Sequence, residues 1–154
     1  MTEPQWLSEQ EMAAWLAFLE ASQLLARRLD QQARKDAGLS YAQYELLARL
    51  SAAPDRSMRM TELADTIITA KSSLTYQVSQ LEKAGLVTRR GCPTDVRGVF
   101  AVLTDEGQRL LERIAPAHVH AVREYFIDLL NPEQLAALTE AMRASRDRLR
   151  GLVS

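Results

Sequence analysis

Small polar side chains gather between residues 71 and 80, where their hydroxyl and amide groups could bind another polar molecule. Leu74, Val78 and Leu81 recur at helical spacing and predict a helix with one buried face. A solvated helix usually carries Glu and Lys on its outer face, whereas this outer face is nearly uncharged. Ser, Thr, Tyr and Gln donate to and accept from base edges and phosphates in a major groove. The candidate contacts to nucleic acid on this helix are Lys71, Ser72, Ser73, Thr75, Tyr76, Gln77 and Gln80.

A β-hairpin is expected directly after this helix. Residues 86–90 and 99–103 have the alternating, β-branched character of strands. Two glycines and a proline between them indicate a long loop over residues 91–98. The hairpin is the second place where this chain could contact a nucleic acid, because it carries three arginines.

The three arginines of the hairpin have different expected roles. Alternation along a strand places Arg89 and Arg90 on opposite faces, so one of them is expected to point at the nucleic acid and the other at solvent. Arg97 lies near the tip with only Asp95 to pair with, and an exposed ion pair there would add little stability. We therefore expect Arg97 to contact the nucleic acid, and Asp95 to belong to the same site.

A short helix before residue 68 completes the unit that positions these side chains. Thr61 is a plausible N-cap, and Leu63, Ala64 and Ile67 share one face. Residues 68–70 form a turn into the second helix, which Gly85 ends in a left-handed conformation. Two helices joined by a turn and followed by a hairpin form a winged helix. The fold class predicted for the chain is mainly α with a small β-hairpin wing, α+β.

Three short runs then make the sequence similar to a known family. LEKAGLV at residues 81–87, DVR at 95–97 and LTDEG at 103–107 resemble the multiple-antibiotic-resistance regulator (MarR) family, over almost the whole chain. The resemblance implies a dimeric transcriptional regulator that binds palindromic double-stranded DNA, most often a repressor that a small aromatic or anionic effector releases. The family often has Asp-Arg-Arg at the wing tip, where this chain has Val96, which leaves the minor-groove contact to Arg97.

The N-terminal part is expected to hold two helices. Ser8 and Glu11 form a capping box for a helix of about 29 residues that continues to Gly38. Ser40 starts a second helix that ends near Pro54.

The C-terminal part is expected to be helical as well. A long helix is predicted from Thr104 through Leu129, with Pro116 interrupting and bending it because proline removes a backbone donor. Asn131 caps a last helix that has Pro132 at its first position.

These long helices indicate a homodimer. The domains expected are a helical dimerisation region, residues 1–39 and 108–154, and a winged helix-turn-helix, residues 40–107. The end helices offer more apolar surface than one winged helix can cover, so we expect them to pack against a second copy. The alternative is that they fold back on their own domain. Two recognition helices related by a twofold axis would read half-sites about 34 to 36 Å apart.

The distribution of charge indicates that one part of the chain, and not its whole surface, would bind nucleic acid. The net charge is −1, but residues 56–97 hold seven Lys or Arg and four Asp or Glu, while the rest holds 12 basic and 16 acidic residues. One cysteine cannot form an internal disulfide, and neither a signal peptide nor a membrane span is recognisable. We therefore expect a cytoplasmic protein.

Other chemistry is not indicated. Cys92 lies beside arginine and could be a redox sensor, but no second cysteine is present to resolve an oxidised thiol, so an inert residue is preferred. His118 and His120 point in different directions on a helix and predict no metal site. No phosphate loop or nucleophile constellation occurs, so we expect neither an enzyme nor a cofactor.

Regulation by an effector would use the junction of the long helices with the winged helix. The family resemblance places the ligand there, and in this chain we expect the lining to be Trp15, Leu19, Tyr44, Leu47 and His118. The alternative is that these residues are ordinary core.

Tyr76 has an alternative role as well: it could be a partly buried anchor for its helix and not a contact to the nucleic acid. A winged helix that binds another protein is the alternative function, although such a surface would show an aromatic or leucine-rich patch.

Overall fold

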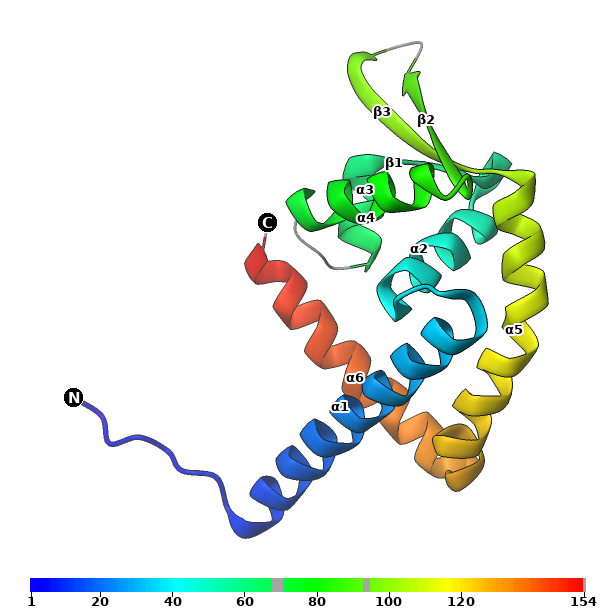
Figure 1. Cartoon of the computed structure of the whole chain (residues 1–154). Helices are drawn as coiled ribbons and strands as arrows, with labels where there is room; N and C mark the ends of the chain where they lie inside the picture. The colour runs from blue at the N-terminus through cyan, green and yellow to red at the C-terminus, as the bar shows by residue number, and fades with distance from the viewer. Residues whose placement is uncertain (68–70, 93–94, 154) are drawn as a thin grey trace. The chain divides into compact units, whose positions relative to one another are not determined.

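The structure is a computed structural model that describes residues 1–67, 71–92 and 95–153 (Figure 1); of residues 71, 92, 95–97 and 153 it describes the backbone alone. The chain forms two compact units, Met1–His118 and Val119–Ser154, which are treated separately below. The predicted turn at residues 68–70 and the tip residues 93–94 lie outside the described part.

The first unit holds most of the secondary structure, and the predicted mainly helical class with a small sheet is confirmed. Its elements, in chain order, are α1 (Glu9–Ala37), α2 (Tyr41–Ala52), the 3-10 turn η1 (Pro54–Arg56), β1 (Ser57–Arg59), α3 (Met60–Ile67), α4 (Lys71–Lys83), β2 (Val87–Cys92), β3 (Asp95–Leu103) and the start of α5 (Asp105–Tyr125).

Local capping begins α1 and α2 where the sequence predicts. The Ser8 hydroxyl accepts from the Glu11 N–H at 3.2 Å, and the Glu11 carboxylate accepts from the Ser8 N–H at 2.8 Å. Ser40 and Gln43 repeat this arrangement at α2. Gly38 has φ +68°, a left-handed conformation that ends α1. The predicted capping box of α1 and the predicted start of α2 at Ser40 are confirmed.

α3 and α4 form the helix pair of the predicted helix-turn-helix. α3 starts at Met60 directly after β1, so Thr61 lies in its first turn rather than at the cap. Gly85 ends the α4 segment with φ +77°, and the Leu86 N–H donates to the Leu81 carbonyl at 3.0 Å. The predicted left-handed stop at Gly85 is therefore confirmed.

The sheet differs from the sequence prediction in two respects. It has three antiparallel strands in the order β1-β3-β2, and β1 was not foreseen. The hairpin also has no eight-residue loop, since β2 runs to Cys92 and β3 starts at Asp95. The loop predicted over residues 91–98 was too long because backbone pairing needs no side chain, and Gly91 pairs with Val99 within the ladder.

One apolar core holds the winged helix together. Leu47, Leu50 and Leu63 have no exposed surface, and the buried face of α4 packs in the same cluster. Further members come from the end of α1, from β3 and from the first turns of α5, among them Ala33, Ala101, Leu103, Leu111 and Ile114. These segments therefore fold as one body with α2, α3 and α4.

The connection from β3 to α5 is fixed by hydrogen bonds to the turn after α4. The Thr104 hydroxyl donates to the Gly85 carbonyl at 2.8 Å and accepts from the Gly107 N–H at 3.0 Å. The Thr104 N–H donates to the Leu86 carbonyl at 3.1 Å. α5 then stays helical through Pro116, so the predicted interruption does not occur.

The second unit holds the end of α5, the 3-10 turn η2 (Ile127–Leu129) and α6 (Pro132–Val153). α5 ends at Tyr125 and not at Leu129 as predicted, because the Phe126 backbone leaves the helical conformation with φ −145°. The Asn131 side chain accepts from the Gln134 N–H at 2.9 Å, which confirms the predicted cap of the last helix.

Candidate nucleic-acid interface

α4 presents two chemically distinct faces. Leu74, Val78 and Leu81 are buried in the core, as predicted from their spacing. The other face is open to solvent, and Tyr76 is 61% exposed there, so it does not act as a buried anchor. The remaining predicted contacts whose side chains are described are exposed or half-buried: Ser72, Ser73, Thr75, Gln77 and Gln80.

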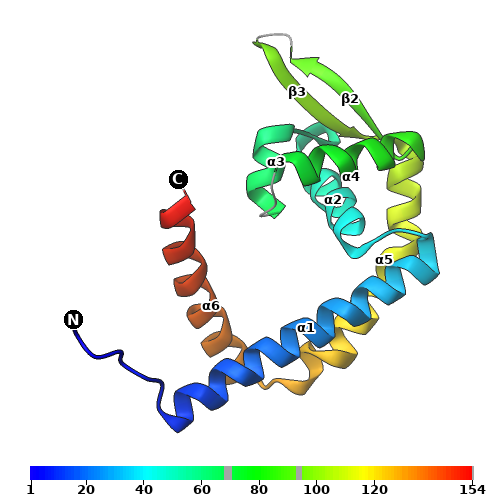
Figure 2. The same cartoon turned by 60° about the vertical axis from the view of Figure 1, so that its left-hand side comes forward.

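The wing lies beside α4 in both ribbon views (Figures 1 and 2). Its two neighbouring arginines face opposite ways, because they pair with successive residues of β3. Arg89 pairs across the sheet with Ala101, whose side chain is fully buried. Arg90 pairs with Phe100, on the other face. The sheet register therefore decides which partners each guanidinium reaches.

Arg89 reaches the C-terminal half of α4. Its guanidinium donates to the Ser79 hydroxyl and to the Thr75 carbonyl, the latter at 3.4 Å, and lies 3.9 Å from the Glu82 carboxylate. These contacts join the base of the wing to α4. Arg89 thereby helps to fix the position of the wing relative to α4.

A row of three residues crosses the sheet on its other face. Phe100 on β3 pairs with Arg59 on β1 and with Arg90 on β2. The guanidinium carbons of these arginines lie 5.6 and 5.5 Å from the centre of the Phe100 ring, within cation–π range. Arg59 was not among the predicted contacts, because β1 was not recognised in the sequence.

Four predicted site residues are located only by their backbone. Lys71 begins α4, Cys92 ends β2, and Asp95 and Arg97 lie in the first part of β3. Their side chains are outside the described part, so their predicted roles stay predictions. The structure does place the backbone of Arg97 on the wing.

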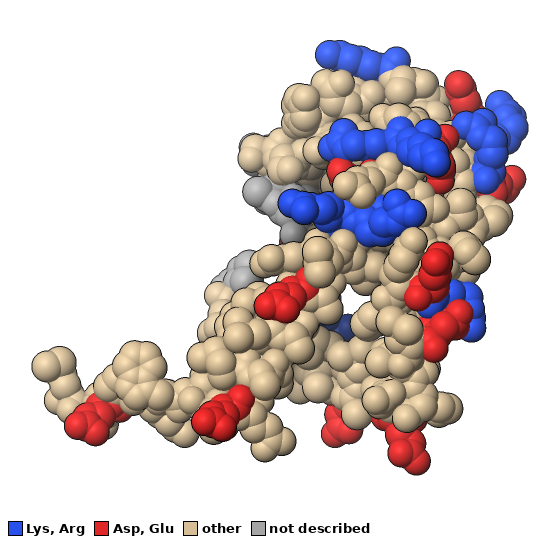
Figure 3. All heavy atoms as spheres, turned by 60° about the horizontal axis from the view of Figure 1, so that its bottom comes forward, with Lys and Arg blue, Asp and Glu red and all other residues tan. Residues whose placement is uncertain are grey.

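Charge is distributed unevenly along the chain. Residues 1–26 contain four glutamates and no Lys or Arg. Figure 3 shows this on one face, where the charged side chains of the extended N-terminal tail are acidic and Lys and Arg gather elsewhere. A polyanion would therefore be repelled by the N-terminal segment and attracted by the winged helix.

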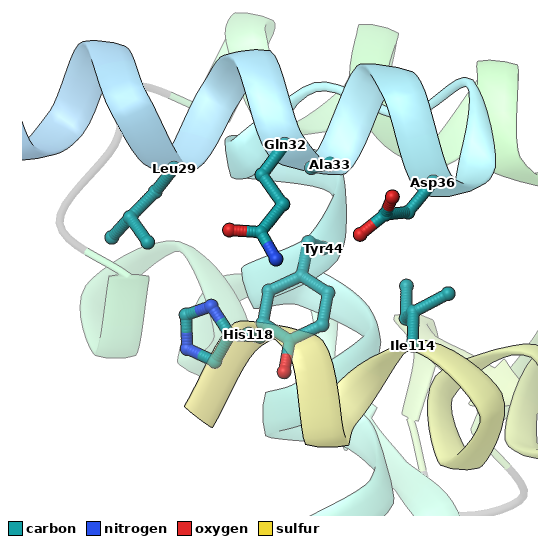
Figure 4. A pocket seen from close by; sticks show the side chains of 7 residues that line it. All are labelled: Leu29, Gln32, Ala33, Asp36, Tyr44, Ile114 and His118. Atoms are coloured by element: carbon teal, nitrogen blue, oxygen red, sulfur yellow. The ribbon is translucent and has the colours of Figure 1, made fainter. Parts of the chain in front are cut away.

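A small hollow lies between α1, α2 and α5 within the first unit (Figure 4). Gln32 hangs from α1 towards Tyr44 of α2 and His118 of α5, whereas Asp36 lies on the side of Ile114. The cavity volume is about 10 Å³, which holds roughly one water molecule. Its lining is Leu29, Gln32, Ala33, Asp36, Tyr44, Ile114 and His118.

Aromatic rings form one wall of this hollow. The His118 ring lies 4.5 Å from that of Tyr44 and 5.8 Å from that of Tyr41. Burial lowers the pKa of His118 and raises the pKa of both tyrosines, so all three are neutral at pH 7. The Gln32 amide donates to the Ala117 carbonyl at 2.8 Å and ties α1 to α5.

Two of the five predicted effector residues line this hollow, Tyr44 and His118. Leu47 is fully buried in the core of the winged helix. Trp15 and Leu19 lie earlier on α1, where the Trp15 ring is 6.2 Å from that of Phe18. Gln32 and Asp36 also line the hollow but were not among the five predicted residues, whose role stays a prediction. The spacing of four residues between Gln32 and Asp36 on one helix face was the available signal.

Within 1–67, 71–92 and 95–153, no three His, Cys, Asp or Glu side chains are grouped so as to hold a metal ion. In the same ranges, no helix is both long and apolar enough to span a membrane.

Comparison with known proteins gives consistent results. Residues 39–99 match the MarR family. The structure superimposes with a TM-score of 0.93 and 46% identity on Sco3205 of Streptomyces coelicolor, a MarR family transcriptional regulator crystallised in complex with DNA, covering 97% of this chain and 93% of that one. AbsC, a MarR family regulator of the same organism, gives 0.92 and 40%, with 96% and 99% covered. MhqR, an HTH-type transcriptional regulator of Bacillus subtilis, is 28% identical over 137 residues, which are 89% of this chain and 92% of MhqR.

Proposed function

Since the chain belongs to the MarR family of transcriptional regulators, and is therefore not an enzyme, we propose that it is a homodimeric repressor that binds a palindromic DNA operator and responds to a small effector. The observation that carries this proposal is the exposed, uncharged polar face of α4 beside an arginine-bearing wing. That face lacks the leucine-rich patch of a protein-binding surface. The proposal implies the cytoplasm, where bacterial DNA lies.

In this proposal α4 enters the major groove. Ser72, Ser73, Thr75, Tyr76, Gln77 and Gln80 then read base edges or hold phosphates, with Lys71 at the start of the helix. Arg97 on the wing takes the adjacent minor groove, and Asp95 orients it. Arg89 fixes the angle between helix and wing through its contacts to Ser79 and Thr75.

The dimer is supported by apolar surface at both ends of the chain. Trp15, Leu16 and Leu24 of α1 are between 45% and 64% exposed, and Leu149 and Leu152 of α6 are 57% and 68% exposed. Contiguous apolar side chains on long helices mark a surface that another protein covers. A second copy is the occupant we propose, because a palindromic operator requires two recognition helices.

The effector site we propose is the hollow lined by Gln32, Asp36, Tyr44 and His118. Its aromatic wall suits a small aromatic molecule, and the Gln32 amide is a hydrogen-bond donor for an anionic group. An aromatic acid needs far more room than one water molecule, so binding requires α1 and α5 to separate and the Gln32–Ala117 hydrogen bond to break. An effector that prefers this opened form would shift the protein away from the form that binds DNA.

The DNA-binding proposal is tested by selecting duplexes from a random library with the full-length protein, followed by gel-shift titration. We expect a palindromic consensus. Arg97→Ala should weaken binding to that consensus and leave the melting temperature nearly unchanged. Arg113→Ala, an exposed arginine on α5, is the control and should bind as the parent does. Failure to select any sequence would contradict the proposal.

The dimer is tested by light scattering at micromolar concentration and by deletion of residues 131–154. The full chain should have the mass of two copies, and the shortened chain should be monomeric or insoluble. A shortened chain that stays dimeric would place the interface elsewhere.

The effector proposal is tested with benzoate and its hydroxylated forms as probes. An inducer should lower operator affinity by about 5-fold to 150-fold, and operator DNA should lower inducer affinity by the same factor. His118→Ala and Gln32→Ala should weaken this response, whereas Trp15→Ala, outside the hollow, should preserve it. Equal responses in all three variants would remove the hollow as the regulatory site.

A further inference from the structure

A groove separates α4 from the wing and runs past the junction of β1 and α3. Its volume is about 420 Å³, and its lining comes from five elements: Arg59, Met60, Thr61, Thr75, Arg89, Gly98 and Val99. Two arginines and two threonines are among these residues, and no Asp or Glu is among the described residues that line the groove. We call it the wing groove. Its chemistry is that of an anion site.

Arg59 lies at the edge of the wing groove, where the sheet directs its guanidinium to the face opposite that of Arg89. Its residue is the last of β1, directly before α3, and pairs with Phe100 of β3. The guanidinium lies over the Phe100 ring, which Arg90 approaches from the neighbouring strand. Stacking on an aromatic face leaves the in-plane N–H donors of a guanidinium directed outwards. Arg59 is therefore oriented before any ligand arrives.

Arg89 is held on the side of the groove formed by β2 and α4. It donates to Ser79 and to the Thr75 carbonyl, and a guanidinium has five N–H donors in all. Glu82 is the acidic group that faces it, at 3.9 Å, and both side chains are partly exposed. A weak exposed pair of this kind does not cancel the attraction of the site for an anion.

The position of the wing groove identifies the anion. With α4 in a major groove and the wing in the adjacent minor groove, the sugar-phosphate strand that separates these two grooves of DNA must pass between α4 and the wing. We propose that the wing groove holds a phosphate of that strand, with Arg89 and the hydroxyl groups of Thr61 and Thr75 as donors on the side of α4 and Arg59 as a charged donor at the outer edge of the groove. This inference rests on the proposed DNA-binding function, and it adds Arg59 and Thr61 to the interface.

The test compares two substitutions of Arg59 in the full-length dimer, on the selected operator and on a scrambled duplex. Arg59→Met keeps an unbranched chain over Phe100 but removes the charge, whereas Arg59→Lys keeps the charge. Because phosphate contacts carry no base information, Arg59→Met should lower affinity for both duplexes, by about 10-fold. The slope of log affinity against log salt should become shallower by about 1 per subunit, or about 2 for the dimer. Arg59→Lys should retain most of the slope.

A second measurement identifies the phosphate. Single phosphates of the operator are replaced by neutral methylphosphonates, and each substituted duplex is titrated with the parent protein and with Arg59→Met. At one position in each half-site the replacement should weaken binding by the parent and have little effect on Arg59→Met, as a double-mutant cycle requires for a direct contact.

The outcomes separate this inference from the proposed function. If the parent selects an operator but Arg59→Met binds with unchanged affinity and salt slope, Arg59 only covers Phe100 and the wing groove is not a phosphate site. Loss of binding to the operator alone, with the scrambled duplex unaffected, would also overturn the inference, because it would indicate base contact. If the parent selects no DNA at all, the proposed function itself fails.

Discussion

The winged helix and the long end helices differ in how completely they bury their own apolar side chains. In the winged helix, Leu47, Leu50 and Leu63 have no exposed surface at all. On the outer parts of α1 and α6, Leu24 and Leu149 remain 64% and 57% exposed. Leucine is therefore used for two purposes in one chain. In the winged helix it stabilises a self-contained fold, and on the end helices it leaves apolar surface that we propose a second copy covers.

The same two regions differ in charge. The first 26 residues are acidic without a basic residue, whereas residues 56–97 carry seven Lys or Arg against four Asp or Glu. Exposed polar and basic groups on the winged helix suit a charged, hydrated partner. Exposed apolar groups on the end helices suit a dry protein interface. The polarity of the exposed surface, rather than exposure alone, therefore distinguishes a surface for a charged, hydrated partner from a surface for another protein.

The largest loss of stability should come from a cavity in the core of the winged helix. Leu47→Ala removes a fully buried side chain from a close-packed cluster and should destabilise the fold by about 2 to 5 kcal/mol. Urea titration followed by circular dichroism measures the loss. A loss similar to that of Leu24→Ala in a dilute, monomeric sample would contradict the distinction between the two regions.

A smaller effect is expected where α5 begins. A Cβ at Gly107 would lie 2.3 Å from the Leu86 carbonyl oxygen and 2.6 Å from a Leu103 methyl group, so Gly107→Ala should cost about 1 to 3 kcal/mol. Gly151→Ala is the matched control, because nothing lies within 4 Å of its added methyl group. Alanine there should raise the stability of α6 slightly. Equal melting temperatures for the two variants would show that the β3–α5 connection is loosely packed.

The third prediction concerns the end helices. Leu149→Ala should leave the unfolding free energy of a dilute monomer nearly unchanged and raise the dimer dissociation constant at least about tenfold, since each subunit loses an interface side chain. Sedimentation velocity over a range of concentrations measures this constant. An unchanged constant would place Leu149 outside the interface.

The smallest effect should come from the pH dependence of His118. Burial against Tyr44 and Tyr41 holds its pKa below the ordinary value of 6.5 in the folded state. The unfolded chain therefore takes up the proton first as the pH falls. Stability is fully present above pH 6.5 and is partly lost as the pH falls through the folded-state pKa.

His118→Gln removes this titration. Thermal melts at pH 7.5 and 5.5 should show a larger drop for the parent than for His118→Gln. If both proteins lose the same amount, His118 titrates normally and is not buried among the two tyrosines.

Local features were predictable from the sequence because their causes are local. Ser8 with Glu11 and Ser40 with Gln43 form capping boxes within four residues, and Gly85 ends its helix through its own conformation. The faces of α4 follow from periodicity alone. The exposed polar face of α4 depends on these elements, so its residues were predictable as well.

Features that depend on distant pairing were not predictable. β1 has three residues, and its partner β3 lies about 40 residues further along the chain, so no local pattern distinguishes it from a loop. Arg59 was missed for this reason. Glycine at 91 was interpreted as a loop signal, although pairing with Val99 keeps it in the strand. The effector residues were chosen by type, yet Leu19 lies about 15 Å along α1 from Leu29, the first residue of that helix in the hollow.

The Thr104 hydrogen bonds connect the end of α4 to the start of α5. One side chain joins the carbonyl after α4 to the first turn of α5, with distances of 2.8 and 3.0 Å. A displacement of the first turn of α5 would therefore be felt at the end of α4, through Thr104 as well as through the core that the two helices share.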